Sequence, residues 1–202
     1  MSTEAQDHMV SAHPNDPLLP QDAGQVLLPL ARAAIAAQLG AAVAAREDAA
    51  WLSQLRATFV TLTYNNQLRG CIGTLQASRP LVADVKANAI NAAFRDPRFK
   101  PLTAQEYATL IVEVSVLSPV SGIAFRDEQH ALAQIRPGID GIIFEYGHHR
   151  STFLPQVWEQ FSDTQTFMGH LKNKAGLPPD FWDASVKLSR YTVAKWSERT
   201  QP

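Results

Sequence analysis

Alternating apolar and polar residues near the middle of the chain predict a β-hairpin. Residues 58–64 alternate threonine with larger apolar side chains, and residues 68–75 run back after Asn65 and Asn66. Because asparagine tolerates the positive φ angles of a tight turn, this pair favours a short connection between two antiparallel strands. The second of these strands carries Cys71, the only cysteine of the chain.

Further strands are predicted in the second half of the chain. Residues 110–117 alternate valine with polar side chains, which is typical of a strand with one buried face. Residues 141–146 and 151–154 predict a second hairpin, and residues 186–196 predict one final strand.

The first helix is predicted between Asp22, a candidate N-cap, and Gly40, a typical helix stop. Pro29 falls inside this range, so either the helix starts late or it is kinked there. An alanine-rich stretch that ends at Ala50 either continues this helix or forms a second piece.

Two later helices have clear boundary signals. Pro80 suits a first helical position and opens a helix that reaches about Phe94, whereas Asp163 caps a helix that ends at Gly176. Hairpins interleaved with helices, without a regular βαβ alternation, predict an α+β fold. We therefore expect a mainly antiparallel sheet with flanking helices.

The composition excludes several functional classes. The 202 residues carry a formal net charge of −1 and no long basic run, so no nucleic acid or membrane partner is expected. A single cysteine excludes an internal disulfide and a thiolate-rich zinc or iron–sulfur site. The G-x-S-x-G, phosphate-loop, H-E-x-x-H and dinucleotide-binding motifs are also missing, so the common hydrolase, kinase, zinc-protease and dehydrogenase classes lack support. We expect no cofactor.

The first 20 residues predict a disordered leader, because they are polar, contain three prolines and have no apolar signal-peptide core. No apolar run approaches the ~20 residues that span a bilayer. We therefore expect a soluble cytoplasmic protein with a single domain over residues 21–197 and a short tail over residues 198–202.

The candidate chemistry centres on residues 68–74, with the sequence LRGCIGT. Gly70 and Gly73 leave the backbone bare on both sides of Cys71, which suits close approach of a ligand. Arg69 lies two positions before the cysteine, so on a regular strand it shares the face of the thiol and favours the thiolate. The opposing interpretation is a small buried cysteine, with the glycines marking a bulge or tight packing.

Other polar residues extend the candidate site beyond Cys71. Asp96 and Arg98 flank a proline in a rigid turn, where they either bind a ligand or pair internally and cap backbone groups. Glu113 interrupts an apolar strand, either on its solvent face or as a buried acid aimed at the site. His148 and His149 point to opposite faces of a strand, so no metal site is predicted there.

A series of short segments carries a family resemblance. In chain order they are residues 68–74 (LRGCIGT), 92–99 (AAFRDPRF), 101–103 (PLT), 113–119 (EVSVLSP), 136–141 (RPGIDG), 152–158 (TFLPQVW) and 174–179 (KAGLPP). They resemble the AMMECR-type domain family, also called protein A of the AmmeMemoRadiSam system, over residues 22–197. The resemblance implies a main antiparallel sheet with helices on one side, together with a smaller subdomain.

The resemblance also implies a pathway shared with Memo-like and radical SAM proteins, but it names no reaction. The chain lacks the three-cysteine cluster motif, so it is not itself the radical SAM member. One functional hypothesis is a ligand or catalytic groove centred on Cys71 as candidate nucleophile. Its candidate binding residues are Arg69, Gly70, Gly73, Thr74, Asp96, Arg98, Glu113 and Thr152. The alternative is a non-catalytic adaptor or ligand-binding module with a structural Cys71, so enzymatic activity stays an open question.

Removal of the leader tests its predicted disorder. A protein that begins at Gln21 should melt at the same temperature as the full chain. The reason is that residues 1–20 lack the apolar groups that would offset a backbone ordering cost of about 1–2 kcal/mol per residue. Differential scanning calorimetry of both proteins is the measurement. A melting temperature lowered by several degrees would show that the leader docks on the domain.

Overall fold

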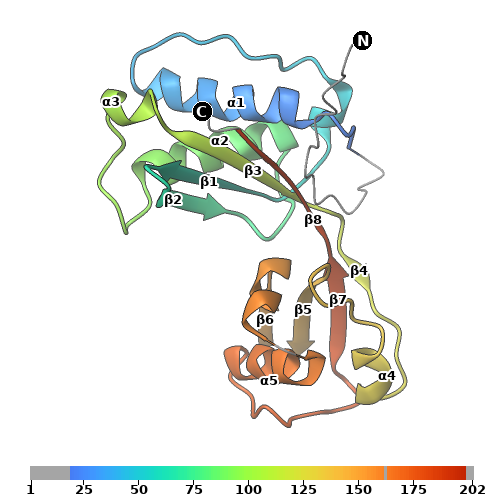
Figure 1. The fold of residues 1–202 in the computed structure, drawn as a ribbon. Helices are drawn as coiled ribbons and strands as arrows, with labels where there is room; N and C mark the ends of the chain where they lie inside the picture. Colours follow the sequence, from blue (N-terminus) through green and yellow to red (C-terminus); the bar gives the residue numbers. More distant parts are fainter. Residues whose placement is uncertain (1–18, 162, 199–202) are drawn as a thin grey trace, which may run out of the picture.

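Two four-stranded antiparallel sheets, each accompanied by helices, make up the fold (Figure 1). The computed structural model describes residues 19–161 and 163–198. Most of the predicted leader and of the tail therefore lies outside the described residues. Leu19, at the start of the described chain, packs against the core of the first sheet.

The first sheet has the strand order β2-β1-β3-β8. Its strands are β1 (Thr58–Tyr64), β2 (Gln67–Gly73), β3 (Ile111–Leu117) and β8 (Val193–Ser197). Asn65 and Asn66 have φ angles of 49° and 59°, so the predicted tight turn joins β1 to β2. The predicted first hairpin is confirmed, and each strand is within two residues of its expected start.

Helices α1 (Gly24–Gln38) and α2 (Leu81–Phe94) cover one face of this sheet (Figure 1). The alternate strand residues Val60, Leu62 and Val114 are fully buried in the same apolar core as these helices. The valine alternation therefore marks the covered face, as the period of two predicts.

The start of α1 differs from the expectation. The N-cap position is Ala23 rather than Asp22, and no side chain caps the helix there. Ala23 already has helical angles of −51° and −30°, and the carbonyl of Asp22 accepts a hydrogen bond from Gln25. A capping side chain needs an extended residue at the helix entry, so a chain that enters through a helical turn leaves Asp22 no capping role. Pro29 lies inside the helix, which does not start late.

The segments around these helices complete the first subdomain. After Gly40, with a φ of 82°, residues 41–49 have no regular structure, so the alanine-rich stretch does not continue α1. A short 3₁₀ helix, η1 (Ala50–Ser53), follows it, and α3 (Ala104–Tyr107) precedes β3. Pro80 is the N-cap of α2 rather than its first helical residue.

The second sheet has the order β4-β7-β5-β6 and forms the second subdomain. Its strands are β4 (Ser121–Gly122), β5 (Gly141–Tyr146), β6 (His149–Phe153) and β7 (Lys187–Tyr191), and its helices are α4 (Glu128–Leu132), the 3₁₀ helix η2 (Pro155–Gln160) and α5 (Thr164–Lys174). The side chain of Asp163 accepts a hydrogen bond from the backbone N–H of Thr166, so its predicted capping role is confirmed.

The final strand predicted over residues 186–196 is wrong, because the chain divides there between the two sheets. β7 belongs to the second sheet and β8 to the first, with Thr192 between them. The backbone N–H of Thr192 donates to Ser118 Oγ at 2.9 Å, and its carbonyl accepts from the N–H of Ser118 at 2.9 Å. These bonds fix the crossing point, which the sequence of residues 186–196 does not reveal because it carries no turn or break signal there.

An apolar cluster joins the two sheets beside this crossing. Phe59, Leu117 and Val193 of the first sheet pack with Ile143 and Tyr191 of the second. The smaller subdomain that the family resemblance implies therefore has a four-stranded sheet of its own and is attached at one end of the first sheet (Figure 1).

The absence of a side chain at Gly70 allows β2 to approach α2 closely. A Cβ atom at Gly70 would lie 2.1 Å from the backbone oxygen of Ala92, a contact that only backbone movement relieves. Gly70→Ala should therefore lower the free energy of unfolding by about 1–3 kcal/mol. The control is Gly122→Ala on β4, where an added Cβ meets nothing within 4 Å. Urea unfolding of both variants is the measurement, and equal stabilities would show that the close approach is incidental.

Candidate functional site

Cys71 lies in a row of polar side chains that crosses the first sheet. On β1 its partner is Thr61, which is also opposite Glu113 of β3, and Glu113 is opposite Ser197 of β8. Directly opposed residues of a sheet share a face. This row therefore lies on the face away from α1 and α2, since the neighbouring residue Val60 is buried on their side. We call this surface the open face of the first sheet.

A β-bulge at Arg69 decides which face Cys71 occupies. Thr63 is opposite Leu68, but Leu62 is opposite Gly70, so β2 contains one extra residue at Arg69. Without the bulge, regular pairing continued from Thr63 and Leu68 would place Cys71 opposite Val60, on the helix-covered face. A one-residue change of register exchanges the two faces of a strand. The bulge therefore directs the thiol to the open face.

The guanidinium of Arg69 pairs with α3 instead of approaching the thiol. Its Nε donates to Glu106 Oε1 at 2.8 Å, and its Nη2 donates to the carbonyl of Lys100 at 2.9 Å. The expectation that Arg69 shares the face of Cys71 assumed a regular strand, and the bulge removes that regularity. Arg69 instead anchors the bulged residue to Glu106 of α3 and to the segment before α3 at Lys100.

The thiol itself is half-buried, and a hydroxyl is next to it. Cys71 Sγ lies 3.3 Å from Thr61 Oγ1, and either atom can be the donor. Neither Thr61 nor its contact with the thiol was predicted from the sequence. The hairpin indicated the facing strand, but the bulge shifts the partner by one position.

Asp96 and Arg98 contact the main chain of Cys71 from the outer edge of β2. Asp96 Oδ2 accepts from the backbone N–H of Cys71 at 2.9 Å, and Arg98 Nη2 donates to its carbonyl at 3.2 Å. The two side chains also pair with each other, at 2.7 Å between Arg98 Nη2 and Asp96 Oδ2. Of the two roles open at the sequence level, internal pairing and backbone capping describe these contacts.

Thr74 belongs to a buried hydrogen-bond network and not to the row of Cys71. Its hydroxyl donates to Asp84 Oδ2 at 2.8 Å, and the same carboxylate accepts from the hydroxyl of Thr58 at 2.7 Å and from Asn88 Nδ2 at 3.0 Å. Arg79 pairs with the second carboxylate oxygen at 2.6 Å. Because Asp84 is fully buried, this network compensates the desolvation of its charge and ties β1 and β2 to α2.

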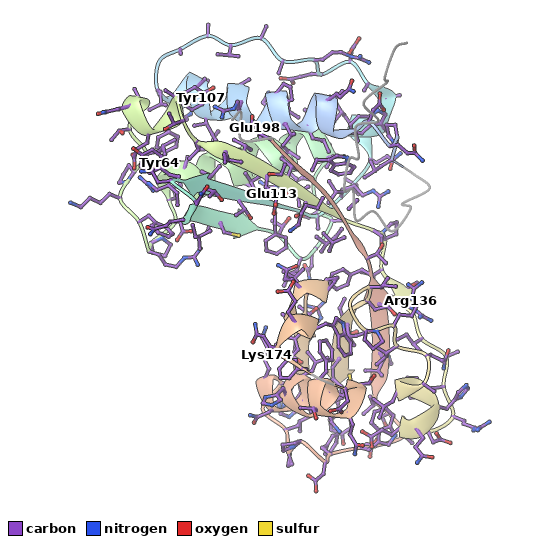
Figure 2. The ribbon with its side chains drawn as sticks, in the orientation of Figure 1. Tyr64, Tyr107, Glu113, Arg136, Lys174 and Glu198 are labelled. Carbon is purple, nitrogen blue, oxygen red and sulfur yellow. The ribbon has the colours of Figure 1, made fainter. Side chains whose placement is uncertain are left out.

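Glu113 lies on the open face and pairs with a lysine. Its Oε1 is 3.3 Å from Lys195 Nζ of β8, and its side chain is 25% exposed. Figure 2 labels Glu113 on the first sheet. Of the two alternatives that the sequence left for Glu113, a position on the open face is the one observed, although three quarters of its side chain is covered.

Thr152 lies on β6 of the second sheet, apart from the row of Cys71. It is buried, and its hydroxyl is 3.0 Å from the hydroxyl of Tyr191. Burial raises the pKa of Tyr191, so this phenol stays protonated at neutral pH and donates to the carbonyl of Phe153. Thr152 thus supports the second sheet next to the apolar cluster.

The histidines of the second hairpin have structural contacts. His149 Nδ1 is 2.8 Å from the carbonyl of Ala175, and its ring lies 4.2 Å from that of His148. In the described ranges 19–161 and 163–198, no three His, Cys, Asp or Glu side chains gather in a way that would hold a metal ion.

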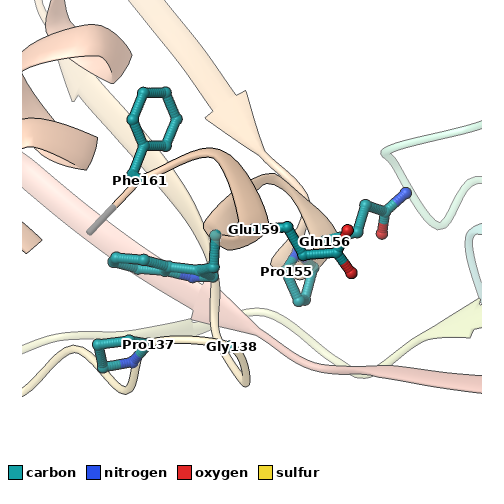
Figure 3. A pocket seen from close by; sticks show the side chains of 7 residues that line it. Pro137, Gly138, Pro155, Gln156, Glu159 and Phe161 are labelled. Atoms are coloured by element: carbon teal, nitrogen blue, oxygen red, sulfur yellow. The ribbon is translucent and has the colours of Figure 1, made fainter. Parts of the chain in front are cut away.

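A shallow hollow of about 340 Å³ lies on the second subdomain (Figure 3). It is lined by Pro137 and Gly138 from the RPGIDG segment, and by Pro155, Trp158 and Phe161 from η2 and the residue after it. The indole of Trp158 stacks on Phe167 with 3.7 Å between ring centroids, and its Nε1 donates to the carbonyl of Asp140 at 2.8 Å. These contacts give Trp158 a packing role in the second subdomain.

The chain belongs to the AMMECR1 family, whose family model matches residues 28–196. Protein MJ0810 of Methanocaldococcus jannaschii is 41% identical over 150 residues, covering 72% of this chain and 75% of the relative. A protein of Methanothermobacter thermautotrophicus is 38% identical over 185 residues, covering 89% of this chain and 96% of the relative.

A solved structure has the same fold. The crystal structure of the uncharacterized protein PH0010 from Pyrococcus horikoshii matches with a TM-score of 0.74 and 35% identity, covering 91% of this chain and 95% of that chain. The family and the α+β antiparallel fold indicated by the short segments are therefore confirmed. Within the described residues, none of the helices has the length and apolar character needed to cross a membrane.

The ion pair that anchors the bulge predicts a loss of stability in acid. The hydrogen bond from Arg69 lowers the pKa of Glu106 from 4.5 to about 2. A carboxylate whose pKa is depressed by folding stabilises the native state above its unfolded pKa, and this contribution disappears as the pH falls. Stability should therefore decline between pH 4.5 and about 2, and Glu106→Gln should remove part of that decline.

Urea unfolding of both proteins over this pH range is the measurement. The control is Glu47→Gln, which removes a more exposed carboxylate paired with Lys86. An unchanged acid profile in Glu106→Gln would mean that the pair does not stabilise the folded state.

Proposed function

We propose that this AMMECR1-family protein binds a ligand on the open face of the first sheet, with the Cys71 thiol in direct contact with it. The observation that carries the proposal is the single row formed by Cys71, Thr61 and Glu113 on the face without helices. A thiol, a hydroxyl and a carboxylate there offer different kinds of polar contact. The thiol is half-buried, so a bound group would be partly shielded from water.

The geometry favours recognition over catalysis by the thiol alone. A cysteine nucleophile needs a base within hydrogen-bond reach or a strong positive field. Among the described residues, the side-chain hydrogen bond recorded for the thiol is with the hydroxyl of Thr61. Glu113 is separated from Cys71 by the whole of β1 and pairs with Lys195. We therefore propose that Cys71 contacts the ligand and does not act alone as a nucleophile.

The adaptor alternative has its own support. Arg69 pairs with Glu106, Gly70 makes room for α2, and Thr74 joins the network around Asp84. These groups of the LRGCIGT segment serve the fold, as expected if the protein presents a rigid surface to another protein and Cys71 is structural. The two hypotheses differ in whether the thiol is reachable in the native protein.

A proposal about the pathway comes from the family resemblance. We propose that the ligand, or the protein that carries it, belongs to a pathway shared with Memo-like and radical SAM proteins. A shared pathway accommodates both hypotheses, because a binding face can receive either a small molecule or a segment of a partner protein.

Alkylation of the native protein tests the proposed binding face. Iodoacetamide should modify Cys71 in the folded protein at a rate within about tenfold of that in the urea-unfolded chain, because the half-buried thiol faces a surface without helices. Mass spectrometry of quenched samples gives the rates. Modification that occurs only after unfolding would overturn the proposal and favour the adaptor with a structural Cys71.

Cys71→Ser provides the matching variant. The replacement is nearly isosteric, so the variant should unfold at a urea concentration close to that of the wild type. A strong loss of stability would instead indicate a buried hydroxyl without adequate partners, and hence a structural cysteine.

A further inference from the structure

The main chain of Cys71 is unusual for a residue of an edge strand, because charged side chains occupy both of its outward hydrogen-bonding groups. β2 is the outer strand of the first sheet, and Cys71 turns its N–H and carbonyl away from β1. On an ordinary edge these groups face solvent or another chain. Here Asp96 accepts from the N–H at 2.9 Å and Arg98 donates to the carbonyl at 3.2 Å, as a neighbouring strand would.

The two side chains are themselves locked together. Asp96 is 1% exposed, and it accepts from the backbone N–H of Arg98 at 3.1 Å and from its Nε at 3.0 Å. The hydrogen bond from Arg98 is the main cause that holds the pKa of Asp96 well below its usual range, so the carboxylate is ionised at neutral pH. Pro97 between them restricts Asp96 to an extended conformation, which keeps the turn rigid.

The Arg98 guanidinium touches Cys71 through the carbonyl oxygen of that residue, at 3.2 Å. The hydrogen bond with Asp96 raises the pKa of Arg98, so the guanidinium stays charged. A cation near a thiol favours the thiolate, whereas an anion disfavours it. The two residues that hold the backbone of Cys71 thus carry opposite charges, and each charged group lies within hydrogen-bond distance of the main chain of Cys71.

We propose that Asp96 and Arg98 are positioning residues that fix the main chain at Cys71 and, through their opposite charges, set how readily its thiol reacts. This inference deepens the proposed function and rests on it, since positioning matters only if the thiol contacts a ligand. It also means that residues 96–98 hold the backbone of the LRGCIGT segment, a relationship that neither segment reveals by itself.

Alkylation rates of two charge-removing variants test the electrostatic half of the proposal. Asp96→Asn removes the anion and leaves the cation, so Cys71 should react with iodoacetamide at least about threefold faster near pH 7. Arg98→Gln removes the cation and leaves the anion, so the reaction should be at least about threefold slower. The pH profile of the rate should move to lower pH in the first variant and to higher pH in the second.

A matched ion pair in the second subdomain supplies the control. Arg136 pairs with Asp140 at 2.6 Å with side-chain exposures of 53% and 0%, against 53% and 1% for Arg98 and Asp96. Arg136→Gln therefore removes a similar pair far along the chain from Cys71 and should change the alkylation rate by less than about twofold. If Asp96 and Arg98 were purely structural, both substitutions would loosen β2, and the alkylation rates of both variants would change in the same direction. That result would overturn the proposal.

Hydrogen exchange at the Cys71 amide tests the positioning half without using the thiol. A carboxylate accepts a stronger hydrogen bond than a neutral amide, so exchange in Asp96→Asn should be about tenfold faster than in the wild type. An unchanged exchange rate would refute the positioning of the Cys71 main chain by Asp96, even if Cys71 binds a ligand. Faster exchange, together with a thiol that stays unreactive in the native protein, would show that Asp96 holds the main chain of Cys71. It would nevertheless overturn the proposed function and the inference that rests on it.

Discussion

The β-bulge at Arg69 is the constraint on which the candidate site depends. It adds one residue to β2 after the tight turn, and every later residue of the strand changes face as a result. Gly70 then meets α2, where only glycine fits, and Cys71 meets Thr61 on the open face. The pairing of Arg69 with Glu106 holds the extra residue in place. A regular hairpin with the same sequence would bury the thiol against the helices.

Buried aspartates of both subdomains pair with arginines, and two of these pairs, Asp96–Arg98 and Arg136–Asp140, lie within the family segments. Asp84, Asp96 and Asp140 are all buried, and each accepts hydrogen bonds from an arginine close to it in sequence. A buried carboxylate without such a partner would be strongly destabilising. These pairs fix loops against strands in both subdomains. Charged residues of the family segments are therefore weak indicators of a ligand site in this fold. The proposal for the open face is supported instead by the position of Cys71, Thr61 and Glu113 in one row.

Phe59 links the candidate site to the second subdomain. A Cβ atom at Gly73 would lie 2.2 Å from its ring, so the missing side chain lets the ring lie over β2. The same ring packs in the cluster that contains Ile143 and Tyr191 of the second sheet. The C-terminal end of the described chain is also tied to the first subdomain, because Glu198 pairs with Arg32 and accepts from the N–H of Val112 (Figure 2). The two subdomains therefore meet beside the open face rather than on the helix side.

The sequence by itself determined the local elements and the family. Alternation identified β1 and β3, Asn65 and Asn66 identified the turn, and a run of short segments identified the relationship, because each of these signals is encoded by neighbouring residues. Only the tertiary structure decided the register of β2, the division of residues 186–196 between two sheets and the partners of Asp96. Those features depend on contacts between residues far apart in the chain. Periodicity reports which residues share a face of a strand, but not which of the two faces a distant helix covers.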